Sequence, residues 1–548
     1  MENELLLSPP TPVRQPAEFE PMEGVLIRYP FGISYQVIKE MAKDATVVTI
    51  VADVSQKNTV LTNFQNQGVN IDNCEFLIAP SNTHWTRDYG PWFIFNGYNE
   101  QGVTDFTYNR PRPSDNLIPS AYAANQSLPL YNMPLVHTGG NYMTDGQGIS
   151  ISTDLVWSEN SGYTQSQIRD IVMEYLGVHT YHVVPDANGD YIKHIDCWAK
   201  YLSPTKIMIR EVPPSHPRYN AIESAVSYFE AQLSCYDIPY DVVRVYTPNN
   251  EPYTNSLILN NKVLVPITGS QWDAAALTSY EDAMPGYEVL GFTGSWQSTD
   301  ALHCRTMGIT DRHMLYIEHT PLFGSQEGNN GYTIQTKIYP YSGENIISST
   351  TGVHWKVEGQ DWNFISLQPL GNHQYHATIP GQENGSQISY YIQAEDESGR
   401  IENHPYIGAP DPHTFTAYND NNTPDTPQRP TGPASGKAGS TYRYSTSTID
   451  IDGDMIFYIW DWGNGNNSEW LGPYESGVEI STMNSWDEEG SYEIRVKAKD
   501  AYGEESDWSE PLAVTMPKNS LQSMPLLQKI GQIFPGISQL ISVLLSIF

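Results

Sequence analysis

The chain has 548 residues, of which 39% are hydrophobic and 12% aromatic, so it is long enough for several domains and too apolar for a disordered polymer. It contains 29 lysines and arginines against 63 aspartates and glutamates, a net charge of −34. This charge excludes nucleic acid and anionic membranes as electrostatic partners and favours a cationic substrate.

The composition and the first residues bear on where the protein works. Charged residues make up 17% of the chain, against about 25% in typical soluble domains, and 36 tyrosines are present. This surface chemistry is typical of β-rich, secreted or cell-surface proteins. The opening residues MENELLLSPP have no basic segment and only a short apolar run, so no signal peptide is expected in the chain as given.

The first 328 residues or so alternate strand-like and helix-like stretches. The runs VLIRYP, TVVTIVA and SLILNNKVLVPI predict strands, and residues 164–176 and 218–233 predict helices. Such alternation indicates an α/β or α+β domain.

Within this domain the stretch HWTRDYG, residues 84–90, places Asp88 beside Arg87 and among the aromatic residues Trp85 and Tyr89. A carboxylate in an aromatic pocket suits a guanidinium group, which takes hydrogen bonds at its edge and ring contacts at its face. A turn aspartate with a salt-bridge partner is an equally good interpretation of this stretch alone.

The stretch YNRPRPSD, residues 108–115, places Arg110 and Arg112 each before a proline. A residue before proline is pushed into extended geometry, so we expect both arginines to be held extended and to project toward a common anion. Two rigid guanidinium groups suit bidentate recognition of a carboxylate. A solvated proline-rich loop is the alternative.

If the stretch YIKHIDCW, residues 191–198, is a strand, its side chains alternate between two faces. His194 and Asp196 then share one face, while Cys197 packs into the core on the other. A histidine beside a carboxylate is a plausible acid/base and cation-binding pair, although this spacing also occurs by chance.

The stretch DALHCRT, residues 300–306, contains Cys304, one of four cysteines in the chain. No C-x-x-C pair is present, which excludes a zinc ribbon, while the even count permits disulfides. A thiolate is a strong nucleophile, and a neighbouring cation lowers its pKa. A cysteine, a histidine and two carboxylates are what hydrolytic attack on a guanidinium carbon requires.

The remaining chain is predicted to be β-rich. The runs YTIQTKIYP and ISYYIQAEDESG predict a small β-sandwich over residues 329–417. A Pro/Gly/Asn linker at 419–439 precedes a second sandwich around YIWDWGNG, which resembles the polycystic-kidney-disease (PKD)-type modules of surface proteins. In this module Asp450, Asp452 and Asp454 lack the glycine and glutamate spacing of an EF-hand, so a surface turn is expected.

The last residues, 519–548, contain apolar residues at helical spacing. They are interrupted by Pro535, Lys529 and several polar residues, so we expect a helix that lies on a membrane surface or docks on a partner. A helix packed on its own sandwich is the alternative.

Taken in order, HWTRDYG, YNRPRPSD, HTGGNYMTDG, HIDCW, EPYTNSLILNN and DALHCRT resemble the Porphyromonas-type peptidylarginine deiminases. These belong to the guanidino-group-modifying (pentein) superfamily, which includes the agmatine deiminases. The resemblance covers residues 16–330 nearly continuously and implies a five-bladed α/β propeller with a central active site. It continues into 331–417, where an immunoglobulin-like domain follows the catalytic domain in that family.

The resemblance also implies roles for individual residues. The catalytic set is Cys304 as nucleophile, His194 as general acid and base, and Asp88 and Asp196 as the carboxylates that bind the guanidinium. The substrate-binding set is Arg110 and Arg112, for the α-carboxylate of a C-terminal arginine, with Trp85, Tyr191, Ile192 and Asn255 lining the pocket.

The expected organisation follows from the motifs and the resemblance together. The predicted parts are an N-terminal extension (1–15), a pentein deiminase domain (16–328), an immunoglobulin-like sandwich (329–418), a linker (419–439), a PKD-type sandwich (440–518) and an amphipathic tail (519–548).

The expected activity is hydrolysis of arginine in peptides or proteins to citrulline and ammonia. No cofactor is required for it, and a structural calcium or sodium ion is compatible with the chain. Agmatine lacks the carboxylate that the arginine pair would bind, while free arginine is harder to exclude. A surface binding protein with an inactive deiminase domain is disfavoured, because each catalytic position holds the required residue type.

Overall fold

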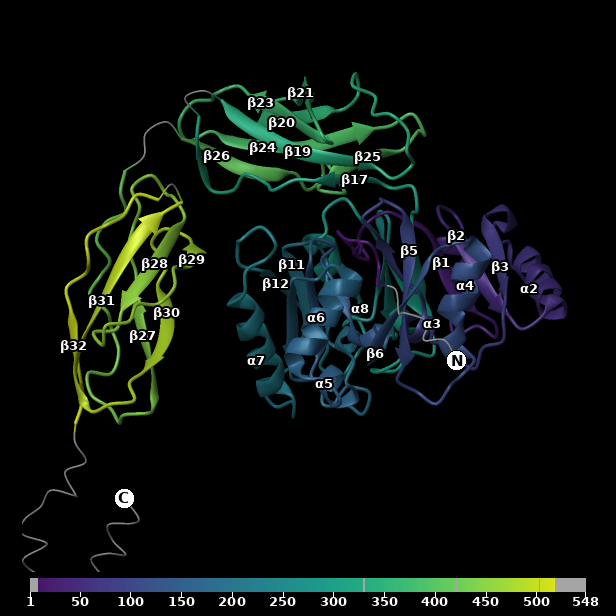
Figure 1. Cartoon of the computed structure of the whole chain (residues 1–548), viewed down its shortest axis with the longest axis horizontal. Helices are drawn as coiled ribbons and strands as arrows, with labels where there is room; N and C mark the ends of the chain where they lie inside the picture. The colour runs from purple at the N-terminus through teal and green to yellow at the C-terminus, as the bar shows by residue number, and fades with distance from the viewer. Residues whose placement is uncertain (1–7, 329–330, 419–421, 502, 518–548) are drawn as a thin grey trace, which may run out of the picture. The chain divides into compact units, whose positions relative to one another are not determined.

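The computed structural model describes residues 8–328, 331–418, 422–501 and 503–517 (Figure 1). By contacts between Cα atoms the described residues form two compact units. The first contains the residues up to Leu322 with Thr333–Ile379 and Ile388–Thr414, and the second contains Phe323–Tyr332, Pro380–Gln387 and the residues from Phe415 onward. The predicted tail helix at 519–548 lies outside the described residues.

The described part of residues 22–310 contains five small sheets. In each, an antiparallel pair of strands is extended by a strand that runs parallel to one member of the pair. Four sheets have three strands: β4 (Trp92–Phe95), β5 (Gln101–Tyr108) and β6 (Leu130–His137); β7 (Met143–Thr144), β8 (Ile149–Thr153) and β9 (Thr180–Val184); β10 (Ala199–Tyr201), β11 (Lys206–Glu211) and β12 (Asp241–Tyr246); β13 (Leu257–Leu259), β14 (Lys262–Ile267) and β15 (Glu288–Thr293).

The fifth sheet joins the two ends of this region. Its antiparallel pair is β16 (Met307–Thr310) and β1 (Met22–Arg28), and β2 (Thr46–Val51) and β3 (Cys74–Ile78) extend it in parallel. The α/β class is therefore confirmed.

Parallel pairing requires a crossover between the strands, and helices supply it in each sheet. The connections are α1 (Tyr35–Met41), α2 (Val54–Gln67) with η1 (Ile71–Asn73), η2 (Asp115–Leu117) with α4 (Ile118–Gln126), α5 (Leu155–Glu159) with α6 (Gln165–Leu176), α7 (Tyr219–Glu230) and α8 (Asp273–Ala283). The predicted helices at 164–176 and 218–233 are confirmed as α6 and α7. A capping box of Thr164 and Gln167 begins α6, and Gly177, with a φ of 72°, ends it.

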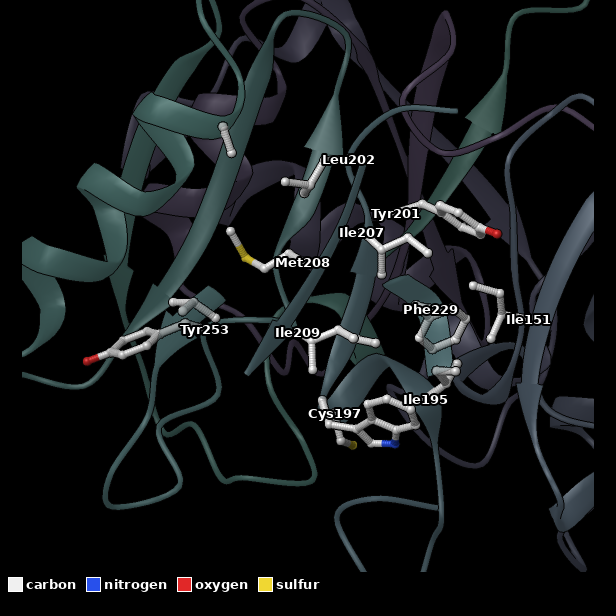
Figure 2. Close-up of a cluster of buried hydrophobic side chains, with 14 of the residues drawn as sticks. Ile151, Ile195, Cys197, Tyr201, Leu202, Ile207, Met208, Ile209, Phe229 and Tyr253 are labelled. Atoms are coloured by element: carbon white, nitrogen blue, oxygen red, sulfur yellow. The ribbon is translucent and has the colours of Figure 1, made fainter. Parts of the chain in front are cut away.

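Apolar side chains from these strands and helices form the cores. The largest cluster contains Cys197, Met208, Phe229 and Tyr253 (Figure 2), and Cys197 is 3% exposed. The prediction that Cys197 packs in the core is confirmed. Strand β11 is buried along most of its length, as expected of a strand covered on both faces.

β-strands dominate the first unit beyond Asp311. One sheet contains β17 (Leu315–Glu318), β19 (Tyr332–Pro340), β23 (Gln374–Ile379) and β22 (Gln368–Gly371), and β20 (Gly352–Val357) pairs with β21 (Asn363–Ser366) and β24 (Gln387–Glu395), which also pairs with β25 (Ile401–His404). The ring of Phe95 in the α/β region stacks on that of Tyr341, with centroids 3.7 Å apart. Arg400 donates two hydrogen bonds of 2.8 and 2.9 Å to the Asp311 carboxylate.

The second unit contains the PKD-type module. Strand β27 (Thr441–Thr446) pairs with β30 (Ile480–Ser485), and a second sheet has the order β29 (Leu471–Tyr474), β28 (Ile456–Asp461), β31 (Gly490–Asp500) and β32 (Leu512–Met516). Side chains from both sheets, including Tyr444, Trp460 and Trp486, form one core, as in a β-sandwich. Also in this unit, β18 (Ser325–Glu327) pairs in parallel with β26 (His413–Tyr418).

None of the helices among the described residues has the length and apolarity needed to cross a membrane.

Candidate active site

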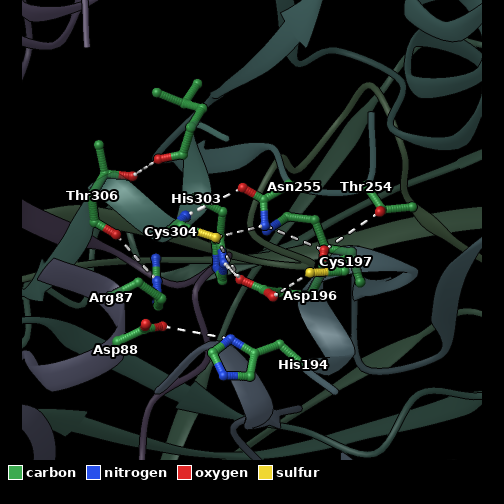
Figure 3. A network of polar contacts seen from close by, with 12 residues as sticks. Arg87, Asp88, His194, Asp196, Cys197, Thr254, Asn255, His303, Cys304 and Thr306 are labelled. Atoms are coloured by element: carbon green, nitrogen blue, oxygen red, sulfur yellow. Dashed lines mark hydrogen bonds and ion pairs between the residues drawn. The ribbon is translucent and has the colours of Figure 1, made fainter. Parts of the chain in front are cut away.

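Each of the five α/β sheets begins directly after a short turn or helical segment, and these five segments carry the candidate site. They are α3 (Thr86–Tyr89) before β4, η3 (Gly139–Asn141) before β7, η4 (Ile195–Cys197) before β10, the turn at Thr254 and Asn255 before β13, and η5 (His303–Arg305) before β16. Figure 3 shows Asp88, His194, Asp196, Asn255 and Cys304 gathered from four of these segments. The repeated topology thus brings residues far apart in sequence to one place.

The segment YIKHIDCW does not form the predicted strand. The Asp190 carboxylate accepts hydrogen bonds from the backbone N–H groups of Ile192 at 3.0 Å and Lys193 at 2.8 Å, and Lys193 has a φ of 55°. This aspartate turn replaces a strand ladder, and the 3-10 helix η4 follows it. His194 and Asp196 are nevertheless both buried in the site, at 2% and 1% exposure.

Cys304 is positioned mainly by Asn255. The Asn255 side chain donates to the Cys304 Sγ at 3.3 Å, and its Oδ1 accepts from the Cys304 backbone N–H at 3.2 Å. The thiol in turn donates to Oδ2 of Asp196 at 3.7 Å. Asn255, which the resemblance places in the pocket, therefore orients the candidate nucleophile toward a carboxylate.

Arg305 does not activate the thiol, contrary to the expectation that a neighbouring cation lowers its pKa. Its guanidinium forms two hydrogen bonds of 2.8 Å with the Asp300 carboxylate and a third, of 2.6 Å, with the Gly32 carbonyl. Burial, with the charges of Asp196 and Asp88, instead raises the pKa of Cys304 well above its ordinary value. The site without a ligand therefore favours the thiol form of Cys304 over the thiolate.

His303 lies between two carboxylates. Its Nδ1 is 2.7 Å from Oδ2 of Asp196, and its Nε2 is 2.7 Å from Oε2 of Glu18. Burial raises the pKa of Asp196, but the hydrogen bond and charge of His303 outweigh it, and the net pKa is lowered. The two ring nitrogens of His303 therefore connect the Asp196 and Glu18 carboxylates.

Glu18 is the centre of a buried charge network. One carboxylate oxygen accepts from Lys200 at 2.6 Å and from the Ile258 backbone N–H at 2.9 Å, and the other accepts from Arg87 at 2.6 Å and from His303. Burial raises the pKa of Glu18, but Lys200, His303 and Arg87 hold it well below its usual range. An internal cavity of about 80 Å³ adjoins this network, with Glu18 and His303 but not Cys304 in its lining.

Sequence reasoning missed Glu18, His303 and Lys200 as members of the site. Two signals were available. His303 directly precedes the cysteine in the sequence, and a buried charge needs partners because burying it unpaired costs much free energy. Neither signal reveals which distant partners such a charge meets.

Asp88 and His194 form the second part of the site. Oδ1 of Asp88 is 3.6 Å from Nδ1 of His194, too far for a hydrogen bond, and neither His194 ring nitrogen has a hydrogen-bond partner among the described residues. Burial raises the pKa of Asp88, while the charges of His194 and Arg110 act against this. Asp88 therefore has one oxygen available to a ligand.

Gly140 permits this arrangement. A Cβ atom at this position would lie 2.5 Å from Nδ1 of His194 and 2.8 Å from Oδ1 of Asp88. Both distances are shorter than van der Waals contact, so any side chain here would displace the histidine and the carboxylate. This close approach explains the second glycine of the HTGG motif, and the first, Gly139, lies against the Arg87 carbonyl oxygen, 2.0 Å from where its Cβ would be.

The two arginines are not held in the expected extended stretch. The Arg112 backbone N–H donates to the Arg110 carbonyl at 2.7 Å, which closes a tight turn around Pro111. The Arg112 guanidinium lies 4.4 Å from the centre of the Trp85 ring and donates to the Tyr108 hydroxyl at 2.9 Å. Both arginine side chains are half-buried.

Tyr108 connects the arginine turn to Asp88, one of the candidate catalytic residues. Its hydroxyl donates to Oδ2 of Asp88 at 3.4 Å while it accepts from Arg112. The remaining predicted pocket residues lie differently: Ile192 is 7% exposed in the hydrophobic core, and Tyr191 is 85% exposed on the loop before His194. Trp85 is thus placed with the arginine pair, whereas Tyr191 and Ile192 do not join the polar network.

Among the described residues, one group of acidic, histidine or cysteine side chains has ligand atoms close enough together to share a metal ion. This group is Asp450, Asp452 and Asp454, which lies outside the active site.

The chain is similar in sequence to several curated proteins. The "Putative agmatine deiminase" of Vibrio parahaemolyticus is 22% identical over 323 residues, which cover 50% of this chain and 90% of the relative. The protein of the same name from Yersinia pseudotuberculosis is 21% identical over 50% of this chain and 89% of its own.

A solved structure shares the fold of the α/β region. The agmatine deiminase of Enterococcus faecalis superimposes with a TM-score of 0.51 and 20% sequence identity, covering 57% of this chain and 100% of its own. The sequence model of the PKD domain matches residues 428–511.

The model of the Porphyromonas-type peptidyl-arginine deiminases matches residues 14–309, which is more than half of the chain and includes each of the five site segments. The chain therefore belongs to the Porphyromonas-type peptidyl-arginine deiminase family, whose members act on guanidino groups.

Proposed function

We propose that the protein hydrolyses the guanidinium group of arginine at the C-terminus of peptides or proteins, producing citrulline and ammonia. The observation that carries this proposal is the grouping of Cys304, His194, Asp88 and Asp196 within a buried charge network. We further propose that the five sheets are the blades of the propeller that the resemblance implies. Their shared connectivity and the pairing of β1 with β16 support this arrangement.

Binding of the cationic substrate activates the nucleophile. The free protein holds Cys304 as a thiol, because burial and the charges of Asp196 and Asp88 raise its pKa. A guanidinium bound by these two carboxylates compensates their charge, which lowers the energy of the thiolate. The thiol proton passes to His194, and the Sγ attacks the guanidinium carbon.

The remaining steps return each group to its starting state. The tetrahedral adduct collapses as the His194 imidazolium protonates the leaving nitrogen, so ammonia departs and a thiouronium remains on Cys304. His194 then removes a proton from water, and the hydroxide attacks the same carbon. The carbon–sulfur bond breaks as the carbonyl forms, the hydroxyl proton is released to solvent, the thiolate regains its proton from His194, and the ureido product leaves.

The arginine turn supports a substrate with a carboxylate. Arg112 is linked through Tyr108 to Asp88. The same pocket therefore offers the Asp88 carboxylate to the guanidinium of the substrate and the Arg112 guanidinium to a carboxylate of the substrate. Arginine carries five N–H donors, and one bond to Tyr108 leaves others for a ligand. The two curated relatives carry the name of agmatine, which has no carboxylate that this turn could bind.

The test compares matched peptides that end in arginine with a free or an amidated C-terminus. A charge-assisted contact contributes about 1.5–3 kcal/mol, so we expect the free peptide to have a roughly 10- to 100-fold higher kcat/KM. Arg110→Ala with Arg112→Ala should remove this preference, whereas Arg443→Ala, at an exposed position in the PKD-type module, should keep it. Equal rates on both peptides, or faster turnover of agmatine, would reject the assignment of a C-terminal arginine substrate.

A further inference from the structure

Three aspartates before β28 gather their carboxylates in one place. One oxygen from each of Asp450, Asp452 and Asp454 lies within 4.8 Å of the others. The chain turns here as the sequence predicts, with a φ of 81° at Gly453, but the side chains do not lie at the surface. Asp450 is 2% exposed and Asp454 is 0% exposed.

Three buried carboxylate oxygens of this cluster lack hydrogen-bond donors. Among the described residues, both oxygens of Asp454 and Oδ2 of Asp450 lack a hydrogen-bond partner. Oδ1 of Asp450 accepts from the Asp452 backbone N–H at 2.9 Å, which leaves Oδ2 free. Buried polar atoms in folded proteins are nearly always paired, so an unpaired, fully buried carboxylate indicates a ligand.

Two other buried aspartates of the chain show the usual situation. Asp115, 0% exposed, accepts from the backbone N–H groups of Asn82 and Thr83 at 2.6 and 3.1 Å and from the Thr83 hydroxyl at 2.7 Å. Asp396, also 0% exposed, accepts from the hydroxyls of Ser342 and Ser398 at 2.6 and 2.5 Å. Asp454 is equally buried, but the Ser325 hydroxyl beside it forms no hydrogen bond of normal geometry with either carboxylate oxygen.

The charge of the cluster is also uncompensated. Among the described residues, no lysine, arginine or histidine forms an ion pair with Asp450, Asp452 or Asp454. The folded module thus gathers adjacent buried carboxylates that no side-chain cation of the described residues compensates, and a bound cation would stabilise them.

We propose that Asp450, Asp452 and Asp454 bind one calcium ion in the PKD-type module. The donor set consists of oxygen atoms alone, which suits a hard cation, and calcium accepts irregular carboxylate geometry more readily than magnesium. The site differs from an EF-hand loop in its spacing and does not depend on the proposed deiminase activity.

The ion would also fix the start of the module. Asp452 accepts from the backbone N–H of Asn422 at 2.6 Å and from its side-chain amide at 3.0 Å. A calcium ion held by Asp452 therefore connects the incoming chain to the buried end of β28. We expect its main effect to be on the stability of the module.

The test uses the full chain after treatment with a chelator. Calorimetric titration with CaCl₂ at pH 7.5 should show one ion bound per chain. Scanning calorimetry should show the transition of the module shifted upward on the order of 10 °C at saturating calcium, with a smaller shift in MgCl₂. Deiminase activity, measured in parallel, should be the same with and without calcium.

Variants separate binding from folding. Asp454→Asn should abolish calcium binding, and its metal-free module should unfold at or above the temperature of the metal-free parent, because a buried charge has been removed. Asp452→Asn, at a half-buried position, should fold normally and bind calcium at least about tenfold more weakly. Asp461→Asn is the matched control: its carboxylate bonds to the Gly463 backbone N–H at 2.9 Å in the same module, and calcium binding should persist.

Some results would overturn the proposal. One is that the folded parent binds no calcium at about 10 mM, a concentration above the dissociation constants of weak extracellular modules. The others are that calcium binding is unchanged after Asp454→Asn or Asp452→Asn, or that magnesium binds with the same affinity as calcium.

Discussion

The active site and the PKD-type module both bury several carboxylates, but only the active site supplies its own cations. Glu18 and Asp196 bond to Lys200, Arg87 and His303, whereas the described residues provide no ion pair for Asp450 or Asp454. Within the active site the exception is Oδ1 of Asp88, which has no hydrogen-bond partner.

This difference separates two uses of a buried acid. A paired carboxylate fixes the charge of its surroundings, and an unpaired one offers a position to a cation from outside. On this view Asp88 receives an organic cation and Asp454 an inorganic one. The following predictions test whether the two regions are independent and whether pairing is what distinguishes them.

The largest expected effect concerns the nucleophile, which only one of the two regions contains. Cys304→Ala should reduce kcat by a factor on the order of 10⁶, because the covalent step is lost. Citrulline release measures this loss, and the calcium response of the module should not change. Cys74→Ser, at a half-buried position, is the control and should retain activity. Substantial turnover by the Ala variant would refute the covalent route.

The second prediction concerns the space beside the unpaired oxygen of Asp88. Gly140→Ala places a Cβ 2.5 Å from His194, and a misplacement of about 1 Å at a catalytic group can lower the rate by a factor of about 100. Gly162→Ala, where a Cβ meets nothing within 4 Å, should have no effect on kcat/KM. Normal activity of Gly140→Ala would show that the pair need not keep its position.

The third prediction converts a paired acid into an unpaired one. His303→Asn removes the cation that lowers the pKa of Asp196, so the acidic limb of the kcat/KM profile should move to higher pH. We expect a loss of roughly 10- to 100-fold near pH 7, the contribution of a charged hydrogen bond. His182→Asn, which replaces a buried histidine bonded to Tyr228, should leave the profile in place. A reduced rate with an unshifted profile would indicate a purely structural role for His303.

The smallest effect is a pH dependence in the module. The pKa of Asp454 is about 6 in the folded module and near 4 in an unfolded chain, so the folded state binds the proton more tightly. The contribution of Asp454 to the stability of the metal-free module should therefore be most favourable below about pH 4, and it should be lost as the pH rises through 6. Thermal unfolding at pH 4.5 and 7.5 should show a difference of a few degrees, which saturating calcium removes at pH 7.5. A flat profile in the absence of calcium would indicate that Asp454 is already compensated.

The sequence pointed to the four residues that the structure gathers in the candidate site, but not to the charged residues that surround them. Cys304, His194, Asp88 and Asp196 lie in short motifs whose residue types limit the chemistry. Their grouping depends on five loops that precede five sheets, and a motif carries no information about such distances. Glu18 could not be assigned from its own surroundings, because it meets His303 across 285 positions of the chain.

Local backbone chemistry explains the two wrong predictions of conformation. The alternating pattern of YIKHIDCW favours a strand, but Asp190 binds two backbone N–H groups and turns the chain. The prolines after Arg110 and Arg112 favour extended residues, yet a hydrogen bond closes a turn around Pro111. In both cases short-range hydrogen bonds outweigh a statistical preference of the backbone.

The contact between the α/β region and the strands that follow it affects how the enzyme can be dissected. A fragment that stops at residue 328, where the sequence suggests a domain boundary, would lose the Tyr341 ring that covers Phe95 and the Arg400 guanidinium that holds Asp311. It would also remove β19 from β17 and expose that strand as an unprotected edge. A soluble catalytic fragment for expression or crystallisation therefore has to extend beyond residue 404.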